Sequence, residues 1–503
     1  MENPGHLIIG AECGVKIGTG HVMRCLALAQ SWRRFGGRAT FLVPGGSPGI
    51  GRRIESEGFS CESLTTEGFT QNVVDRMLSS KPTVAVLDGY GFGCPEQSAL
   101  HEAGSPTLIV DDYGHATEYP ARWILNHNAF ATEEPYARRG KDSVLLLGSR
   151  YALIREEFLQ WLAWKREIPA RAERILITIG GSDPDNLSLR IVEALGAARI
   201  PHLEIILVVG SSNPHLPALR VAVERSALPI KIEQNVSDMP ALMAWADVGI
   251  SGAGGTSYEL CYMGLPALLF VISENQRQVA AKLSGFGAAI HAGWAGEFNE
   301  SKFVEELGAL IESQEKRQGI SGRARSLVDG LGADRVRAAL LDKQITMRRA
   351  HADDCQLLFS WASDPITRSA SFRSSELLWE DHQEWFSQRL QDPQTVIYIG
   401  EGSSGNALGQ TRFQLGCDRA TVSIVVAPEF RGVGWGRELI ALSVRTLARE
   451  YLVRHVDAFI KPGNQTSIRM FESSGFTLAG NREIADQPAL LFTWEAGKVA
   501  YAG

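Results

Sequence analysis

A histidine preceded by two glycines is the first group in this sequence that could do chemistry. It lies in the run Gly18-Thr19-Gly20-His21-Val22-Met23-Arg24, and the apolar residues after it recur every three or four positions, as in a helix. Gly20 lets the backbone approach a ligand, and the free N–H groups of the first helical turn suit an anion. The positive end of the helix dipole disfavours a protonated ring. We therefore expect His21 to be neutral and to act as a general base.

The elements that must position His21 follow an alternating pattern. Apolar runs that predict strands alternate with helical patterns at residues 6–10, 39–43, 84–87, 107–110 and 144–147. This alternation predicts a parallel sheet with ligands at the carboxyl ends of its strands, where Asp88-Gly89-Tyr90 and Asp111-Asp112-Tyr113 fall. Each aspartate could instead cap the next helix. A glycine turn before a histidine can also serve packing or capping, so the catalytic role of His21 depends on further signals in the rest of the chain.

A second alternating series follows a charged break near residues 164–172. Its predicted strands are residues 174–179, 204–209, 248–251 and 267–271. The third of them leads into Gly252-Ala253-Gly254-Gly255-Thr256-Ser257-Tyr258-Glu259, a glycine loop that opens a helix and suits a diphosphate. Glu259 could accept hydrogen bonds from both hydroxyls of a ribose, and Asn275 and Gln276 follow the next strand. A turn that serves only helix packing is the alternative.

A further glycine turn enters a helix in the last third of the chain, after a junction predicted at residues 342–344. A first strand is predicted at residues 345–350, and a long strand at residues 421–427 leads toward Arg431-Gly432-Val433-Gly434-Trp435-Gly436. This is again an anion site at a helix start, here with an arginine beside it.

Composition limits the class of protein. At 503 residues the chain exceeds one ordinary core, and its net charge of −7 is spread without a basic stripe, so neither nucleic acid nor a membrane surface is an expected partner. The seven cysteines are scattered and never form C-x-x-C, which indicates reduced thiols in a cytoplasmic protein without a metal site. No segment approaches the roughly 20 apolar residues of a membrane span.

The motifs of the first two series together resemble one family. The runs at residues 18–24, 88–90, 180–183, 252–259, 274–276 and 329–333 are similar to those of the UDP-2,4-diacetamido-2,4,6-trideoxy-β-L-altropyranose hydrolases of pseudaminic acid biosynthesis, relatives of the MurG-type glycosyltransferases. The resemblance covers residues 1–342 and implies metal-independent attack of water on the anomeric carbon, with UDP leaving. It implies His21 as the base and the following substrate-binding residues: Gly20, Tyr90, Gly254, Gly255, Thr256, Ser257, Glu259, Asn275 and Gln276.

The last third resembles the GNAT acetyltransferases. The R-x-x-G-x-G run and the later stretch from Asn464 to Phe476 occur in that family's order, over residues 345–494. The resemblance implies acetyl-CoA as cosubstrate, bound by Val426, Arg431, Gly432, Gly434, Gly436 and Asn464. The run at residues 361–364, with His382 and Trp385, further resembles sugar-amine N-acetyltransferases. This chain has Phe471 at the position where many relatives carry a tyrosine, whose hydroxyl can protonate the leaving thiolate. His382 or Glu376 could remove a proton from the amine, or either could be structural.

These patterns predict an α/β protein with a GT-B-like pair of Rossmann-like domains followed by a GNAT domain. We expect the domains to span residues 1–166, with the catalytic histidine, 167–342, with the UDP site, and 345–503. The expected function is bifunctional: N-acetylation of the 4-amino group of a UDP-linked amino sugar, and hydrolysis of the diacetamido product to UDP and free sugar. Glycosyl transfer to an acceptor alcohol and a non-catalytic UDP-sugar scaffold are the alternatives.

Overall fold

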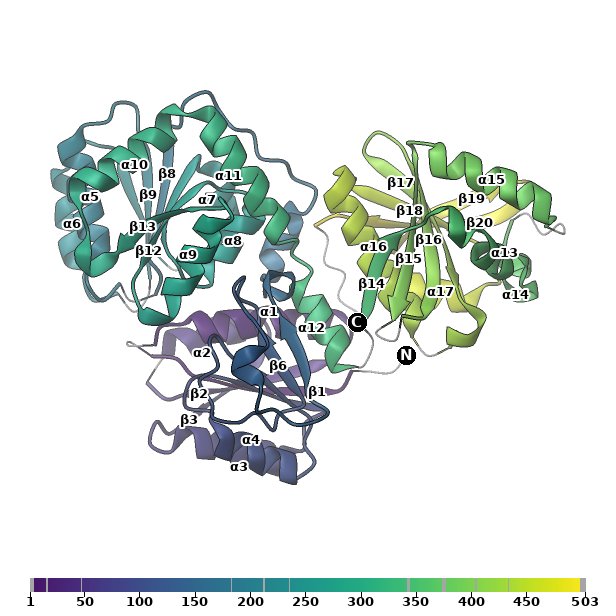
Figure 1. Cartoon of the computed structure of the whole chain (residues 1–503), viewed down its shortest axis with the longest axis horizontal. Coiled ribbons are helices and arrows are strands. Elements are labelled where there is room, and N and C mark those ends of the chain that lie inside the picture. Colours follow the sequence, from purple (N-terminus) through teal and green to yellow (C-terminus); the bar gives the residue numbers. More distant parts are fainter. Residues whose placement is uncertain are drawn as a thin grey trace.

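The computed structural model contains three sheets, which Figure 1 shows as three lobes. It describes residues 4–497 except 15–16, 47, 182, 211–212, 235, 342–343, 373–376, 403–404 and 433. Ser182, Glu376, Val433 and most of the predicted junction therefore lie outside the described residues.

The first sheet is parallel and has the order β3-β2-β1-β4-β5-β6-β7. Because β1 and β4 are neighbours without being consecutive, the strand order reverses between them, and ligands bind at such switch points. The helix that follows β1 is α1 (Gly20–Arg34), so His21, in its first turn, lies at this switch point. The strands are β1 (His6–Ala11), β2 (Arg38–Pro44), β3 (Ser60–Leu64), β4 (Val84–Asp88), β5 (Thr107–Val110), β6 (Trp123–Asn126) and β7 (Val144–Leu147), and the other helices are α2 (Pro48–Ser56), α3 (Phe69–Ser80) and α4 (Cys94–Glu102).

The second sheet is also parallel, with the order β10-β9-β8-β11-β12-β13 and its own reversal between β8 and β11. The glycine loop leaves β11 at this reversal and enters α8. The strands are β8 (Arg174–Thr178), β9 (Glu204–Val209), β10 (Ile230–Gln234), β11 (Val248–Gly252), β12 (Ala267–Val271) and β13 (Ile290–Trp294). The helices are α5 (Leu187–Ala198), α6 (Leu216–Arg225), α7 (Met239–Trp245), α8 (Thr256–Met263), α9 (Arg277–Gly285), α10 (Glu300–Glu312) and α11 (Gln314–Leu327).

Helix α12 (Gly332–Leu340) returns from the second sheet to the first. Its buried residues Ala333, Val336 and Ala339 belong to the same core as Trp32 of α1. The predicted second domain therefore contributes a helix to the packing of the first. The domain boundaries themselves stay a prediction.

The third sheet is mixed, with the order β14-β15-β16-β17-β18-β20-β19. Its parallel neighbours, β17 and β18, are paired from Arg419 opposite His455 to Val422 opposite Ala458, although both strands continue further. The strands are β14 (Ile345–Arg349), β15 (Thr395–Gly402), β16 (Ala407–Leu415), β17 (Arg419–Val426), β18 (His455–Ile460), β19 (Thr477–Ile484) and β20 (Gln487–Glu495). The helices are α13 (Cys355–Ser363), α14 (Pro365–Ala370), α15 (Trp379–Gln391), α16 (Trp435–Tyr451) and α17 (Gln465–Ser473).

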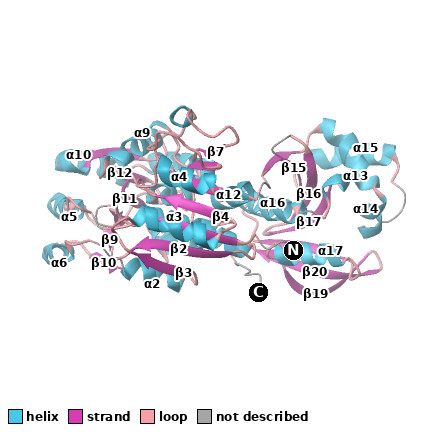
Figure 2. Cartoon of the chain, turned by 90° about the horizontal axis from the view of Figure 1, so that it is seen from below, coloured by secondary structure: helices cyan, strands magenta, loops and turns pink. Residues whose placement is uncertain are grey.

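The third lobe contacts the first through α16 and α12, which lie side by side in Figure 2 and share contacts with the end of α1. Phe35, which follows α1, is buried. The guanidinium carbons of Arg337 and Arg437 lie 3.4 Å and 4.1 Å from the centre of its ring. Arg337 donates two hydrogen bonds to Glu438, at 2.8 and 2.7 Å, and both side chains are buried.

The predicted strands are confirmed, and those at residues 107–110, 144–147, 204–209 and 267–271 have the expected bounds. Strands β3, β6, β10 and β13 of the two parallel sheets, and β15, β16, β18, β19 and β20 of the mixed sheet, were not predicted. Among the described helices, none combines the length and apolar composition that crossing a bilayer requires. All seven cysteines carry free thiols.

Candidate active sites

His21 and Asp88 form a buried hydrogen-bonded pair at the switch point of the first sheet. The His21 Nδ1 lies 2.6 Å from the Asp88 Oδ1, and the two residues are 7% and 0% exposed. The pair forms because α1 follows β1 and Asp88 ends the neighbouring strand β4. A carboxylate can only accept here, so Nδ1 carries the proton of this hydrogen bond and Nε2 is the ring nitrogen that remains to act on a substrate. This assigns Asp88 to the histidine rather than to a helix cap.

Arg24 extends this pair to a second carboxylate. Its Nε donates to the Asp88 Oδ2 at 2.7 Å, and its Nη1 donates to the Asp112 Oδ1 at 2.6 Å. Burial alone would raise the pKa of both aspartates, but the charge of Arg24 outweighs it and holds both pKa values well below their usual range. Both carboxylates are therefore ionised and can fix donors around the histidine.

Tyr90 links this network to the second sheet. Its hydroxyl donates to the Asp112 Oδ2 at 2.8 Å and accepts from the Asn275 Nδ2 at 2.8 Å. Its ring lies edge-on to that of His21, with centres 5.1 Å apart. Burial, followed by the charge of Asp112, raises the Tyr90 pKa, so the hydroxyl stays protonated. The structure thus brings together three predicted residues, His21, Tyr90 and Asn275, at the junction of the two parallel sheets.

Glu259 lies at the same junction, paired with a residue that the sequence analysis missed. Arg155 Nε donates to the Glu259 Oε1 at 2.9 Å, and Arg155 also pairs with Glu157. Arg155 is 8% exposed and lies in the segment that connects the two sheets. Part of the Glu259 carboxylate therefore serves this connection, and its predicted contact with a ribose stays a prediction.

The glycine loop is a tight turn in which some groups are already bonded. The Ser257 hydroxyl donates to the Gly254 carbonyl at 2.6 Å, and the Gln276 Oε1 accepts from the Ile272 N–H at 3.2 Å. A Cβ at Gly255 or at Gly20 would meet nothing within 4 Å, so both backbones border open space. Thr256 begins α8. Backbone N–H groups, rather than the Ser257 hydroxyl, are what this turn offers a phosphate.

The predicted acetyl-CoA residues lie where β17 and β18 diverge. Val426 ends β17, while Gly432 and Gly434 have left-handed backbones, with φ of 81° and 89°. Gly434 precedes the first residue of α16, a 17-residue helix whose first N–H groups suit an anion. The β17–β18 pairing stops before either strand ends, which leaves Ile424 to Val426 unpaired with β18 on that side, and the glycine turn offers N–H donors for a diphosphate. The residues present therefore fit acetyl-CoA.

Other predicted residues of this site make contacts within the protein. Arg431 pairs with Asp364 at 2.8 Å and donates to the Val426 carbonyl at 3.1 Å, so its guanidinium anchors the turn. The Asn464 Oδ1 caps α17 by accepting from the Ser467 N–H at 3.1 Å. A Cβ at Gly436 would lie 2.7 Å from the Met470 Sδ, so α16 and α17 pack closely there. The three contacts to acetyl-CoA stay predictions.

The geometry favours the structural alternative for His382. The residue is 2% exposed and stacks on Phe386 with ring centres 6.1 Å apart. Burial lowers its pKa, partly opposed by a hydrogen bond with the Cys355 backbone, and its Nε2 has no partner among the described residues. Phe471 is buried against Phe476, with ring centres 4.8 Å apart.

Several residues of the histidine site were not predicted from the sequence. Arg24 had a signal, since it lies three residues after His21 and so on the same helix face. Asp112 was predicted to lie at a strand end, since it follows β5, but its contact with Arg24 was not predicted. Asn128 donates to the Asp112 Oδ1 at 3.1 Å and accepts from Tyr258, across the two sheets, and no local pattern indicates that contact. Within the described part of the chain, no cluster of three histidine, cysteine or acidic side chains is placed to hold a metal ion.

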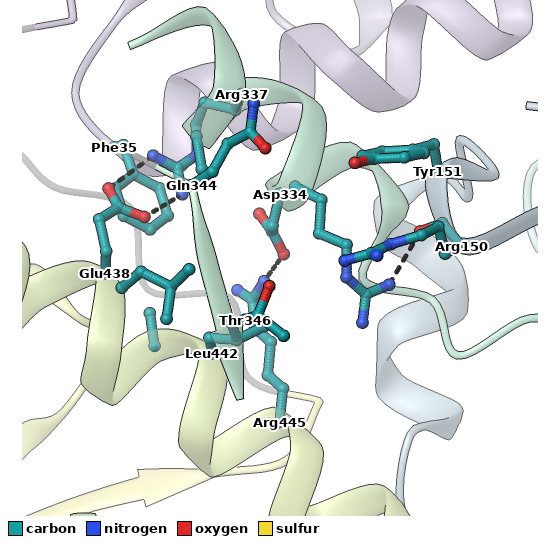
Figure 3. A pocket seen from close by; sticks show the side chains of 14 residues that line it. Phe35, Arg150, Tyr151, Asp334, Arg337, Gln344, Thr346, Glu438, Leu442 and Arg445 are labelled. Atoms are coloured by element: carbon teal, nitrogen blue, oxygen red, sulfur yellow. Dashed lines mark hydrogen bonds and ion pairs between the residues drawn. The ribbon is translucent and has the colours of Figure 1, made fainter. Parts of the chain in front are cut away.

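A small cavity lies between the first and third lobes, away from His21. It holds about 40 Å³ and is lined by residues of α12, β14 and α16, among them Asp334, Thr346 and Arg445 (Figure 3). Phe35 also lines it, and the 14 residues from His21 to Phe35 place it about 20 Å from the histidine along α1. The cavity therefore belongs to the contact between lobes.

Two stretches of the chain match known families. Residues 174–323 match the glycosyltransferase family 28 C-terminal domain, and residues 344–477 match the acetyltransferase (GNAT) domain. With the two parallel sheets and the mixed third sheet, these matches define an α/β enzyme in which a GT-B-like pair of Rossmann-type sheets precedes a GNAT domain.

Named relatives refine this class. The chain is 23% identical over 482 residues to an uncharacterized protein of Methanocaldococcus jannaschii, covering 93% of this chain and 96% of the relative. It is 32% identical over 171 residues to the spore coat polysaccharide biosynthesis protein SpsG of Bacillus subtilis (33% and 50%). It is 28% identical over 217 residues to the UDP-2,4-diacetamido-2,4,6-trideoxy-beta-L-altropyranose hydrolase of Campylobacter jejuni (42% and 73%). Both resemblances are thereby confirmed: the chain joins a region related to that hydrolase to a GNAT domain.

Proposed function

We propose that the first two sheets hydrolyse a UDP-linked 2,4-diacetamido-2,4,6-trideoxy sugar and that the third acetylates the 4-amino group of its precursor. The observation that carries the hydrolase assignment is the His21–Asp88 pair, which engages Nδ1 and leaves Nε2 to accept a proton. The ring of His21 contacts Tyr90, whose hydroxyl accepts from Asn275 of the second sheet. The named hydrolase relative supports the substrate class.

In the proposed hydrolysis, His21 Nε2 takes a proton from water while the water oxygen attacks the anomeric carbon. The bond from that carbon to the phosphate oxygen breaks, and UDP leaves with its electron pair. Asp88 stabilises the imidazolium through Nδ1, and N–H groups of the glycine loop stabilise the charge on the departing diphosphate.

Product analysis tests the hydrolase. The wild-type enzyme, incubated with the diacetamido UDP-sugar, should release UDP and free reducing sugar without any acceptor. His21→Gln should lower turnover about 100-fold or more, the usual scale for a general base, while UDP still binds. Turnover only after an acceptor alcohol is added would favour glycosyl transfer. No turnover by the wild type under either condition, with UDP bound equally well by His21→Gln, would favour a non-catalytic scaffold.

The acetyltransferase needs its own assay. The diverging β17 and β18 and the turn at Gly432 and Gly434 support acetyl-CoA as the acetyl donor. Thiol release from acetyl-CoA in the presence of the 4-amino UDP-sugar, with mass spectrometry of the product, is the expected result. Release no faster than with acetyl-CoA alone would refute this activity.

A further inference from the structure

Tyr113 is an exposed aromatic residue beside the histidine site that the proposed mechanism does not use. It is 45% exposed, in the turn after β5 at the same sheet edge as Asp88 and Asp112. A single exposed aromatic side chain is ordinary in itself. This one contacts Tyr90, with ring centres 5.4 Å apart, and Tyr90 in turn contacts His21.

The turn that carries Tyr113 is held by a buried carboxylate. Asp111, 1% exposed, accepts from the backbone N–H groups of Tyr113 at 2.7 Å and of Gly114 at 2.8 Å, and it also accepts from the Tyr119 hydroxyl. His115 pairs with Asp111 at 3.0 Å. The exposed ring therefore extends from a fixed backbone, as a rigid binding surface requires.

The two tyrosine rings differ in what they offer a ligand. Tyr90 uses its hydroxyl for Asp112 and Asn275, so its ring carbons are what it has left to offer a ligand. Tyr113 adds a second, exposed ring, whose centre lies 5.4 Å from that of Tyr90. A sugar bound at His21 would thus have polar groups and two aromatic rings close by. Such a surface suits substituents that carry methyl groups rather than hydroxyls.

We propose that Tyr113 and Tyr90 form an aromatic wall that packs against the methyl-bearing substituents of the sugar and thereby selects N-acetylated, deoxygenated UDP-sugars. The inference rests on the proposed hydrolase function. Tyr113 is a specificity residue in this assignment: it contacts the substrate away from the reacting bond and takes no proton.

The test is steady-state hydrolysis of the diacetamido UDP-sugar by Tyr113→Ala and Tyr113→Phe. Loss of one apolar contact should raise the KM of Tyr113→Ala about tenfold, with kcat changed by less than about threefold. The inhibition constant of free UDP should stay unchanged, because UDP lacks the sugar. Tyr113→Phe should behave as wild type. Phe286→Ala, which removes a ring 43% exposed at the end of α9, is the matched control and should change neither constant.

Two kinds of failure are distinguishable. No hydrolysis of the diacetamido UDP-sugar by the wild-type enzyme would overturn the proposed function and the wall with it. If the wild type hydrolyses the sugar normally, two results would overturn the wall alone. Tyr113→Ala would keep the wild-type KM, or it would weaken the binding of free UDP as much as that of the sugar substrate. A Tyr113→Phe variant as impaired as Tyr113→Ala would also overturn it, because the hydroxyl would then be the contact.

Discussion

At the scale of single residues, Asp88 determines which nitrogen of His21 can accept a proton. Replacing it by asparagine puts an amide N–H where an acceptor stood, so Nδ1 becomes the acceptor and Nε2 carries the proton. We expect Asp88→Asn to lower the kcat for hydrolysis about 100-fold or more while UDP still binds.

The neighbouring thiol offers a matched control. Cys25 Sγ donates to the other oxygen of the same carboxylate at 3.2 Å. Cys25→Ala should keep kcat within about fivefold, because the proton position on His21 is unchanged. Equal losses in Cys25→Ala and Asp88→Asn, or a fully active Asp88→Asn, would contradict the role given to Asp88.

His127 should make stability depend on pH. It is 4% exposed, and burial, with the charge of Arg24, lowers its pKa to about 4. The unfolded chain takes up a proton near pH 6.5, whereas the folded protein keeps His127 neutral down to about pH 4, so stability falls as pH decreases through that window. We expect this residue to account for a loss of about 3 kcal/mol in the free energy of unfolding.

Urea unfolding at pH 7 and at pH 4.5 measures that effect. His127→Gln retains an acceptor for the Leu153 N–H but does not titrate, so its stability should fall less between the two pH values. An equal fall in wild type and His127→Gln would assign the acid sensitivity to other groups.

The site residues that the sequence could predict are those next to recognisable local patterns. Glycines before His21 and strand ends before Asp88 and Tyr90 indicate their places, because chain order fixes which strand ends share an edge. Arg155 and Asn128 lack such signals: each acts through a partner more than 100 residues away, and only the packing of one sheet against the other brings them together.

At the scale of elements, the fold depends on close approaches that glycine permits. Gly332 begins α12, and a Cβ there would lie 2.1 Å from the carbonyl oxygen of Ala152. Because that atom belongs to the backbone, it cannot turn aside as a flexible side chain would. This contact gives a physical reason for one glycine of the run at residues 329–333, a run first singled out because it resembles a motif of the hydrolase family.

Gly332→Ala should therefore lower the free energy of unfolding by about 1–3 kcal/mol. Gly322→Ala is the matched control: it lies within α11, its Cβ would meet nothing within 4 Å, and it should stabilise by up to about 1 kcal/mol. Denaturant unfolding of both variants gives the comparison. A Gly332→Ala protein as stable as Gly322→Ala would show that the contact between α12 and Ala152 relaxes freely.

The long-range order of the strands was predictable only in part. Many strands with apolar runs were predicted, but β6, with the buried sequence WILN, was missed. Strand β3, with the sequence SCESL, is too polar to resemble a buried strand. The placement of α12 on α1 depends on tertiary packing, which leaves no periodic signal in the sequence. The sequence therefore does not indicate that the helix just before the predicted boundary at residue 342 packs in the core of the first sheet.

At the scale of the whole molecule, a buried ion pair joins the hydrolase-like region to the acetyltransferase domain. Arg337→Met would leave Glu438 buried without its partner and should destabilise by about 3–5 kcal/mol. Replacing both residues by methionine should restore part of that loss, because no unpaired charge remains.

Arg349→Met is the control, since the Arg349–Glu450 pair is 45% and 43% exposed, and an exposed pair is worth only about 0–1 kcal/mol. Thermal unfolding of the three variants measures the difference. Equal effects of Arg337→Met and Arg349→Met would mean that the buried pair adds nothing to the joining of the two regions.

The placement of Phe35 between two arginines has an evolutionary consequence. One of them, Arg337, comes from the last helix of the hydrolase-like region, and the other, Arg437, follows the glycine turn of the acetyltransferase. Exchange of the acetyltransferase domain alone would leave Arg337 on Phe35, because both belong to the hydrolase-like region, and would remove only Arg437. A newly joined acetyltransferase domain would therefore keep this contact only if it carried an arginine at the start of its own equivalent of α16.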